Sequence, residues 1–425
     1  MNKTAIRILV ILLCGILLLG ILAMPLSMLA AEPMYFGRTT LDSNEQYVYD
    51  QLLAGVADCT EVVELEKDRN VTIEQVSAAS LALINDHPEY FWYCGDYVYT
   101  QVNQSYISQV KPTYTLGGKT VTGSSPELVT ARAELANKIN DILSKMTAKT
   151  EYDKVLYLHD YLIGAVEYAA GNDNQTAYGA LIGGKAVCAG YTRAFQLLLN
   201  AAGIQAWKVD GRAVNAKGET EAHSWNLVWL DGKCCYFDPT WDDQGTYKSH
   251  AYFGLSLEQI SADHIANADC TAVLPQCGHN DMGYHTMKAG AGTGVGILTD
   301  TTTAEELATY FASEKNAQGK DVLTCSFWYA GTEYQNWVSE NLGYLAFVLD
   351  LQGEYNCDGL HMGNEYTIVF TGTVKESQLE TLPELPPQDN ALDGQLTELL
   401  VILAAVAVGI IVLIIGLAIG FRKKK

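Results

Sequence analysis

The alternation of apolar and polar residues divides the first part of the chain into helices and one hairpin. Four segments have the apolar spacing of a helix: Leu41–Val56, Thr72–Asn85, the segment from Ser125 to Met146, and Glu151–Val166. Tyr97–Val110 alternates with a period of two, which predicts a strand or a hairpin. We therefore expect residues 32–147 to form an N-terminal helical segment with a small hairpin that supports the following domain.

The next stretch places a cysteine at the start of a helix. Cys188 follows the pair Gly183-Gly184, and an apolar-periodic helix is predicted over Ala189–Ala201 and ends at Gly203. The dipole of this helix and the free N–H groups of its first turn favour the thiolate form of Cys188.

A hairpin is predicted after this helix. His223–Leu230 alternates and predicts a strand, Asp231-Gly232 is a turn signal, and Cys234–Asp238 predicts the return strand. Cross-strand neighbours come within hydrogen-bond reach, so we expect Asp238 to lie beside His223.

A thiol, an imidazole and a carboxylate are the minimum set for acyl transfer through a thioester. Cys188 would attack an amide carbonyl, His223 would pair with the thiolate and protonate the leaving amine, and Asp238 would orient the imidazole. The backbone N–H of Cys188 is one expected oxyanion donor, and Tyr178 is our choice for the second. The competing interpretation is structural, with an inert cysteine, a histidine at a strand end and an aspartate in a turn.

Packing elements are predicted after Asp243. Tyr252-Phe253 predicts a strand, Ser256–Ala262 predicts a short helix, and residues 264–285 are expected to be a loop. That loop contains five potential zinc ligands: His264, Cys270, Cys277, His279 and His285. Their spacing lacks the close C-x2-C pairs of zinc modules, so no metal is predicted. The catalytic domain is expected to cover residues 148–288.

Residues 289–375 are predicted to form a small α+β domain that begins with a Gly-rich linker. The predicted helix is Ala304–Lys315. The predicted strands are Val295–Leu298, Val322–Trp328, Ala346–Leu349 and Glu365–Phe370. Residues 376–398 contain several prolines and are expected to be a spacer.

Both ends of the chain are apolar. Residues 1–31 have a basic start, an apolar run and small residues at the end, which predicts a signal peptide or an uncleaved signal anchor. Residues 399–421 carry no charge and are long enough to cross a bilayer, and the basic tail 422–425 is expected to stay in the cytoplasm. The arrangement predicts a single-pass membrane protein with an extracellular catalytic domain.

The charge between these ends excludes one class of partner. All 49 acidic residues lie within residues 32–398, whereas six of the 27 basic residues lie outside, so this segment has a net charge of (27 − 6) − 49 = −28. Such a surface repels nucleic acid. The expected partners are protein or cell-wall peptide substrates and the membrane.

Eight cysteines besides Cys14 and Cys188 allow up to four disulfides in an exported chain, or they all stay reduced. Cys270 and Cys277 are close enough in sequence to close a local loop. Adjacent cysteines on a strand point to opposite faces, so Cys234 and Cys235 should not pair with each other.

Three sequence blocks resemble a known family. The blocks GGKAVCAGYTRAFQLLL, AHSWNLVWLDGKCCYFDPTWDD and YFGLS are similar to the bacterial transglutaminase-like superfamily, a branch of the papain-like cysteine enzymes. The family pattern G-x-C-x-G-[YF], H-x-W and D-P-[TS] falls on Cys188, His223 with Trp225, and Asp238. Ala186 stands where the pattern has glycine, and Cys234-Cys235 stands where apolar residues are usual.

The resemblance implies an α+β fold with a papain-like transglutaminase core, in which the cysteine helix packs on an antiparallel sheet. It also implies a triad of Cys188, His223 and Asp238, supported by Trp225. Members of the family crosslink glutamine to amines, deamidate, or hydrolyse amides through a thioester, chemistry that needs no cofactor.

We therefore expect a membrane-anchored, extracellular bacterial cysteine acyltransferase or peptidase that acts on glutamine carboxamides or peptide amides. The alternative is a catalytically silent surface adhesion or scaffold protein that retains the transglutaminase-like fold.

Overall fold

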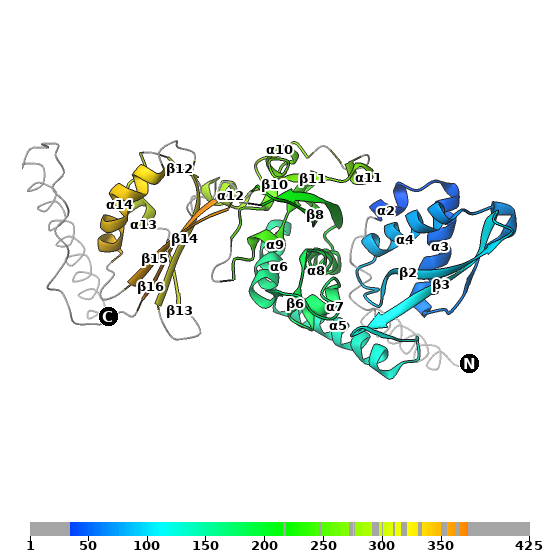
Figure 1. The fold of residues 1–425 in the computed structure, drawn as a ribbon. Coiled ribbons are helices and arrows are strands. Elements are labelled where there is room, and N and C mark those ends of the chain that lie inside the picture. The colour runs from blue at the N-terminus through cyan, green and yellow to red at the C-terminus, as the bar shows by residue number, and fades with distance from the viewer. Residues whose placement is uncertain are drawn as a thin grey trace, which may run out of the picture.

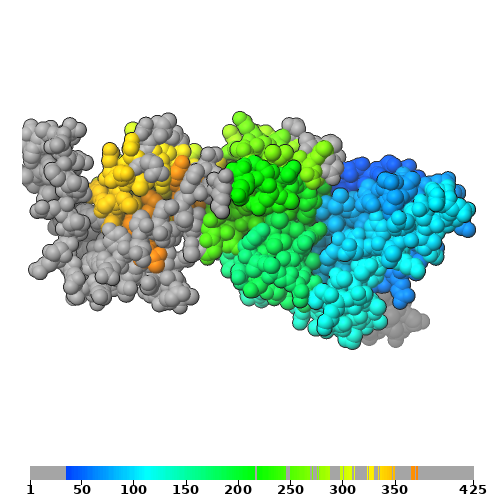
Figure 2. Space-filling view, in the orientation of Figure 1, coloured from blue at the N-terminus to red at the C-terminus, as the bar shows by residue number. Residues whose placement is uncertain are grey.

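Three parts of the chain lie in a row, in sequence order, in the computed structural model (Figure 1). The structure describes residues 35–215, 218–245, 249–271, 275, 277–290, 297–299, 301–308, 311–315, 321–329, 334–349, 355–362 and 365–372. Figure 2 shows the same order of the three parts on the molecular surface. Within these residues, no helix is long and apolar enough to cross a membrane. The predicted signal, spacer, membrane helix and basic tail all lie outside the described residues.

The N-terminal part combines helices with a long hairpin. Its elements are α2 (Phe36–Thr39), α3 (Ser43–Asp58), β1 (Val63–Glu64), η2 (Lys67–Arg69), α4 (Ile73–Asp86), β2 (Tyr93–Val102), β3 (Tyr106–Leu116), β4 (Lys119–Thr120) and α5 (Pro126–Lys145). Asp42 and Thr72 each form a capping box with the third residue of the helix that they begin. The predicted helices and hairpin are confirmed, and the hairpin is longer at both ends than the prediction.

The central part packs a helix that begins at Cys188 on an antiparallel sheet. Its elements are α6 (Glu151–Ala165), β5 (Glu167–Tyr168), α7 (Ala177–Leu181), β6 (Lys185–Ala186), α8 (Cys188–Ala201), β7 (Ala206–Val214), β8 (Thr220–Leu230), β9 (Lys233–Phe237), α9 (Pro239–Asp242), β10 (Phe253–Leu255), α10 (Leu257–Ile260), β11 (His264–Ala266), α11 (Ala268–Thr271) and α12 (Tyr284–Gly290). The sheet has the order β10-β9-β8-β7-β11, with every neighbouring pair antiparallel. The helix α8 contacts β7 and β8, which confirms the predicted α+β core.

The buried face of α8 joins the first two parts. Tyr191, Phe195 and Leu198 are fully buried, in a core that continues through α6 into the helices of the N-terminal part. A second core, which includes Trp207, Trp225 and Tyr236, contains other side chains of the same sheet. The N-terminal segment therefore shares its core with the central part, and this packing fixes the position of α8.

Residues 264–285 are not the loop that the sequence predicted. They contain the strand β11, the helix α11 and the start of α12. The strand β11 pairs with β7 in the register His264 to Ala213, which adds an edge strand to the sheet. The predicted domain boundary after residue 288 falls inside α12.

The C-terminal part is a small sheet with two helices. Its elements are β12 (Ile297–Leu298), α13 (Ala304–Ala308), β13 (Ala312–Lys315), β14 (Asp321–Tyr329), α14 (Tyr334–Val348), β15 (Tyr355–Met362) and β16 (Glu365–Gly372). Two predictions are wrong here. The helix predicted over Ala304–Lys315 ends at Ala308, and the strand predicted over Ala346–Leu349 is instead the last turn of α14, which ends at Val348, followed by Leu349. The buried residues Trp337, Leu345 and Ala346 follow helical spacing, so packing of α14 on the sheet overrides the strand-like apolar run.

One disulfide links distant segments of the central part. Cys234 on β9 bonds to Cys277, so the local loop suggested for Cys270 and Cys277 is wrong. Cys235 is a buried free thiol, which confirms that the two adjacent cysteines do not pair with each other. Among the described cysteines, Cys59, Cys94, Cys188, Cys235 and Cys325 are free thiols, so the four disulfides that the count allows are not formed.

Candidate active site

Cys188 is the first residue of α8, and short-range packing fixes the turn in front of it. Val187 caps the helix in an extended conformation, and its N–H donates to the carbonyl of Asn174 at 3.0 Å. A Cβ on Gly190 would lie 2.3 Å from the same carbonyl oxygen, so only glycine fits there. Ala186, which departs from the family pattern, is fully buried and pairs with Tyr168 in the parallel contact of β5 and β6.

The surroundings of the Cys188 thiol favour its ionised form. Burial opposes ionisation, but hydrogen bonds with His223 and Ser224 and the charge of His223 outweigh it and lower the pKa of Cys188. The thiol is only partly buried, so a reagent can reach it. Burial instead raises the pKa of four other free thiols: Cys59, Cys94, Cys235 and Cys325. The pKa of Cys188 is therefore shifted in the opposite direction to the pKa of these thiols, toward the ionised form that a nucleophile requires.

His223 and Asp238 meet where β9 ends. The β8–β9 ladder closes at the pair Asn226 and Phe237, and Asp238 is the next residue, which caps α9. His223 Nε2 lies 2.6 Å from Asp238 Oδ2, and Oδ1 accepts the N–H groups of Thr240 and Trp241 at 3.0 and 3.3 Å. Because Nε2 is taken by Asp238, Nδ1 is left for the thiol of Cys188.

Charge controls the protonation of this pair. Burial favours a neutral imidazole, but the charge of Asp238 and its hydrogen bond outweigh burial and raise the pKa of His223 to about 10. Burial likewise opposes ionisation of Asp238, but His223 and His264 hold its pKa well below the ordinary value. The favoured state is thus a thiolate beside an imidazolium, with a buried carboxylate behind the imidazolium.

Two indole rings hold the His223 side chain. The ring of Trp225 lies 6.3 Å from the imidazole in a stacked orientation, and the ring of Trp241 lies 5.2 Å from it. Trp225 is 2% exposed. The contact supplies a physical basis for the supporting role predicted for Trp225, because it limits rotation of the imidazole.

Two tyrosines lie upstream of the thiol, in different environments. The hydroxyl of Tyr178 donates to Glu134 at 3.0 Å and its ring stacks on Phe91, so its contacts lie toward α5 and the N-terminal part. Tyr168 is 57% exposed and pairs with Ala186, two residues before Cys188, and burial and the charge of Cys188 both raise its pKa. The oxyanion role of Tyr178 stays a prediction, and Tyr168, which pairs with the segment that leads to Cys188, is a second candidate for it.

His264 is the residue near the triad that sequence reasoning missed. Its Nε2 lies 3.1 Å from Asp238 Oδ2, the oxygen that also contacts His223. The five residues considered as zinc ligands do not converge, because Cys277 is bonded to Cys234 and His285 contacts Glu365 at 2.8 Å. The three-residue strand His264–Ala266 gave too short a pattern to predict the edge strand that places His264 beside Asp238.

A family model matches one segment of the chain. Residues 140–239 match the transglutaminase-like superfamily, and this segment contains Cys188, His223 and Asp238. It is a transglutaminase-like domain. No curated protein matches the chain in sequence.

Three solved structures resemble parts of the chain. A candidate cysteine protease from Cytophaga hutchinsonii is 16% identical over 34% of this chain and 61% of that chain, with a TM-score of 0.22. A TGase is 12% identical over 57% of this chain and 57% of that chain, with a TM-score of 0.24. A candidate protease from Parabacteroides distasonis ATCC 8503 is 11% identical over 66% of this chain and 62% of that chain, with a TM-score of 0.21. The chain spans about three fifths of the length of each.

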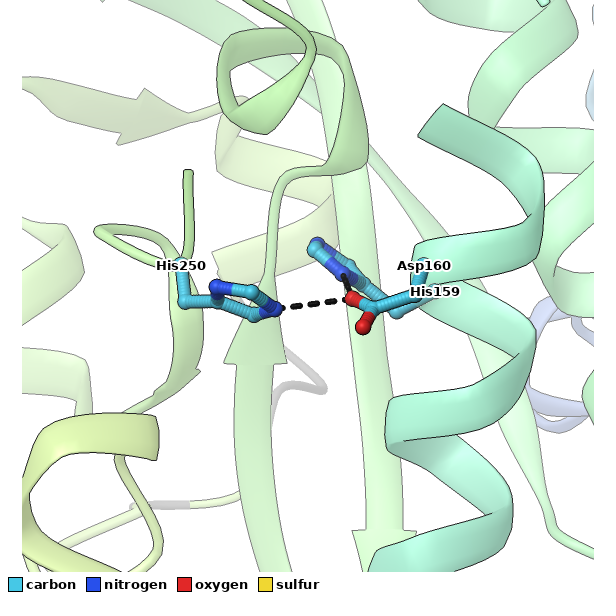
Figure 3. A group of neighbouring side chains, drawn as sticks. All are labelled: His159, Asp160 and His250. Carbon is cyan, nitrogen blue, oxygen red and sulfur yellow. Dashed lines mark hydrogen bonds and ion pairs between the residues drawn. The ribbon is translucent and has the colours of Figure 1, made fainter. Parts of the chain in front are cut away.

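Among the residues that the structure describes, two clusters in and around the transglutaminase-like domain have donor atoms close enough to hold a metal ion. The donor atoms of His159, Asp160 and His250 lie within 4.8 Å of one another, as do those of His223, Asp238 and His264. In the first cluster, Asp160 Oδ1 lies 3.2 Å from His159 Nδ1 and 2.8 Å from His250 Nε2 (Figure 3). Imidazoles and a carboxylate suit zinc, but protons on the imidazoles account for the same contacts as hydrogen bonds. These contacts therefore do not require a metal.

A buried glutamate connects the C-terminal part to the transglutaminase-like domain. Glu365, at the start of β16, is 1% exposed and accepts the backbone N–H of His250 at 3.0 Å. Its second contact is His285 Nε2 at 2.8 Å. Since the side chain of His250 also contacts Asp160 on α6, these bonds tie the small sheet to the domain that carries the triad.

Proposed function

We propose that the transglutaminase-like domain is a cysteine acyltransferase or hydrolase that forms a thioester at Cys188 from a glutamine carboxamide or a peptide amide. The observation that carries this proposal is the chain of contacts from a helix-terminal thiol through His223 to the buried carboxylate of Asp238. The lowered pKa of Cys188 and the raised pKa of His223 support it, because together they favour a nucleophile and an acid in one site.

The proposed reaction assigns one step to each group. The Cys188 thiolate attacks the amide carbonyl, and the resulting oxyanion is bound by the N–H of Cys188 and the hydroxyl of Tyr168. The His223 imidazolium gives its proton to the leaving nitrogen as the C–N bond breaks, which leaves a thioester and a neutral imidazole. His223 then accepts a proton from water or from a second amine, whose attack releases the acyl group and restores the thiolate.

Competitive labelling of thiols tests the first half of this reaction. On full-length protein in mildly acidic buffer, iodoacetamide should label Cys188 faster than Cys59, Cys94 or the other free thiols. His223→Ala should abolish this preference, whereas the exposed His279→Ala should keep it. Equal labelling of all accessible cysteines in the wild type would refute a thiolate at Cys188 and favour the alternative, a silent surface scaffold or adhesion protein.

A second assay separates transfer from hydrolysis. A glutamine peptide is offered with and without a fluorescent amine, and ammonia release and incorporation of the amine are both measured. Transfer gives a Cys188-dependent fluorescent product, while hydrolysis gives ammonia and glutamate at the same rate in both samples. Cys188→Ala is the control for each product.

We also place this activity outside the cell, on a chain held in the membrane by residues 399–421. The apolar ends of the sequence support this location, and the disulfide between Cys234 and Cys277 suits an oxidising compartment. Protein or cell-wall peptides are the substrates that would be accessible there. Deleting residues 399–425 should release the protein from the membrane fraction into the medium, and retention of the deleted chain with the cells would count against the anchor.

A further inference from the structure

We propose that His264 is a positioning residue of this site. Its positive charge lies against the carboxylate of Asp238, next to the charge of His223, and makes it easier for His223 to release its proton. The proposal rests on the proposed function, because it matters only if His223 must release that proton to a leaving group. His264 would act through Asp238, without touching the substrate.

The carboxylate of Asp238 is shared by two imidazoles. His223 Nε2 and His264 Nε2 lie 2.6 and 3.1 Å from the same oxygen, Oδ2. The other oxygen, Oδ1, is occupied by the backbone N–H groups of α9. Asp238 is 0% exposed, and the two imidazole rings are 5.4 Å apart. Each imidazole therefore feels both the carboxylate and the charge of the other.

The contacts of His264 require it to be positively charged. Its Nδ1 lies 2.6 Å from Asp263 Oδ1, so both ring nitrogens face carboxylate oxygens. An ionised carboxylate can only accept hydrogen bonds, so both nitrogens must carry protons. The hydroxyl of Tyr252 donates to the other oxygen of Asp263, Oδ2, at 2.6 Å, which holds this side chain in place. Burial lowers the pKa of His264, but the two carboxylates outweigh burial and raise it.

The elements around His264 contribute few other charges. Asp238 follows β9, His223 comes from β8, and Cys188 lies beyond His223 on α8. The strand β7 places Ala213 opposite His264, so it adds no charge at that position. The rings of Trp225 and Trp241, at 4.8 and 4.6 Å, complete the surroundings. The positive charge of His264 therefore acts on His223 across Asp238, and the negative charge of the more distant Asp263 partly offsets it.

The expected effect of this charge is large enough to measure. Two unit positive charges 5.4 Å apart, at an effective dielectric constant of about 20, change a pKa by about two units. Removal of the His264 charge alone leaves the Asp263 carboxylate in place, so it should raise the pH at which His223 loses its proton by about two units. Neutralising both His264 and Asp263 removes opposite charges and should raise that pH by less, about one unit. The charge thus makes His223 a better acid toward the leaving nitrogen.

Two substitutions remove the charge by different routes. His264→Gln removes the imidazolium and retains an amide that can donate to Asp238. Asp263→Asn leaves His264 in place, but it removes the second carboxylate and allows His264 to become neutral. Asp263 is partly exposed, so this variant tests the proposal even if His264→Gln does not fold. His279→Gln, at an exposed position, is the matched control.

The assay is the rate at which iodoacetate alkylates Cys188 in the full-length protein as a function of pH. This anionic reagent is attracted by the His223 imidazolium, so the rate falls when His223 loses its proton. The fall in rate at high pH, the alkaline limb of the profile, should move upward by about two pH units in His264→Gln and by about one in Asp263→Asn, with no shift in His279→Gln. A limb that stays in place or moves downward in both variants would overturn the proposal, since a purely structural role would lower the rate at every pH.

Side-chain nitrogen NMR of histidine-labelled full-length protein separates this inference from the proposed function. At pH about 8, both nitrogens of His264 should be protonated, which is a property that does not depend on the reactivity of Cys188. A neutral His264 at that pH would refute the inference even if Cys188 reacts as proposed. Conversely, an unreactive Cys188 with a protonated His264 would refute the proposed function alone.

Discussion

Replacing Asp238 by asparagine removes the negative charge behind His223 while keeping the shape of the side chain. An asparagine oxygen can still accept the N–H groups of Thr240 and Trp241, so α9 should keep its cap. The remaining amide group is a donor and would face the two imidazoles. His223 Nε2 would then have to accept a hydrogen bond, which places the ring proton on Nδ1 and favours the neutral ring.

The magnitude follows from the 2.6 Å contact between His223 and Asp238. A hydrogen bond to a charged group contributes about 1.5–3 kcal/mol, which is a lower limit for the stabilisation of the imidazolium. The Coulomb energy of two unit charges at that distance, with an effective dielectric constant of about 20, is about 6 kcal/mol and is the upper limit. Dividing by about 1.4 kcal/mol for each pKa unit gives an expected fall of about one to four units in the pKa of His223.

The assay is again the pH dependence of Cys188 alkylation by iodoacetate. Since Asp238 raises the pKa of His223 to about 10 in the wild type, the alkaline limb should move downward in Asp238→Asn, by at least about one pH unit. This direction is opposite to the shift expected for the His264 variants. The control is Asp281→Asn, which changes an exposed carboxylate paired with Lys233. An alkaline limb that stays at the wild-type position, in a folded Asp238→Asn protein, would refute the ion-pair account.

Three further predictions concern the framework around the site. Burial lowers the pKa of His159, but Asp160 and Asp242 outweigh burial and raise it to about 9. The folded state therefore keeps a proton that the unfolded state releases near pH 6.5. The free energy of unfolding should therefore fall as the pH rises from about 6.5 to 9, by up to about 1.4 kcal/mol per pH unit, and chemical denaturation of His159→Gln should show a smaller fall. Gly190→Ala places a Cβ 2.3 Å from the carbonyl of Asn174, so it should destabilise the fold by about 1–3 kcal/mol and slow alkylation of Cys188, whereas Gly171→Ala, with open space around it, should do neither. Glu365→Ala removes the acceptor of the His250 N–H and of His285 Nε2, whereas Glu365→Gln retains one acceptor oxygen, so the alanine variant should unfold at a lower temperature. Equal unfolding midpoints would contradict the role of Glu365 in joining the two parts.

Local sequence was sufficient to predict the elements that carry Cys188, His223 and Asp238. The helix α8 follows from its apolar spacing and the glycines that flank it, and the β8–β9 hairpin follows from alternation around Asp231-Gly232. These signals act within a few residues, so they do not depend on the rest of the fold. The packing of the helix on the sheet agrees with the resemblance to the transglutaminase-like superfamily.

The environment of the site depends on contacts between distant segments, which the pattern could not predict. His264 reaches Asp238 because β11 pairs with β7, about fifty residues earlier, through only three residue pairs. Tyr168 lies near Cys188 because β5 and β6 form a two-residue parallel contact. Such short strands have no distinctive periodicity. In the C-terminal part, the local pattern favoured a strand, but burial of Leu345 and Ala346 stabilises a helix.

The central claim is that Cys188 is held as a thiolate by the His223 imidazolium. Titration of the ultraviolet absorbance of thiolates measures this directly in the full-length protein, with Cys188→Ala subtracted so that the signal of the other cysteines cancels. We predict that the difference signal is already present at pH about 6, well below the ordinary thiol pKa of about 8.5, and that His223→Ala abolishes it at that pH. A difference signal that develops only above pH about 8.5 in the wild type would contradict the account.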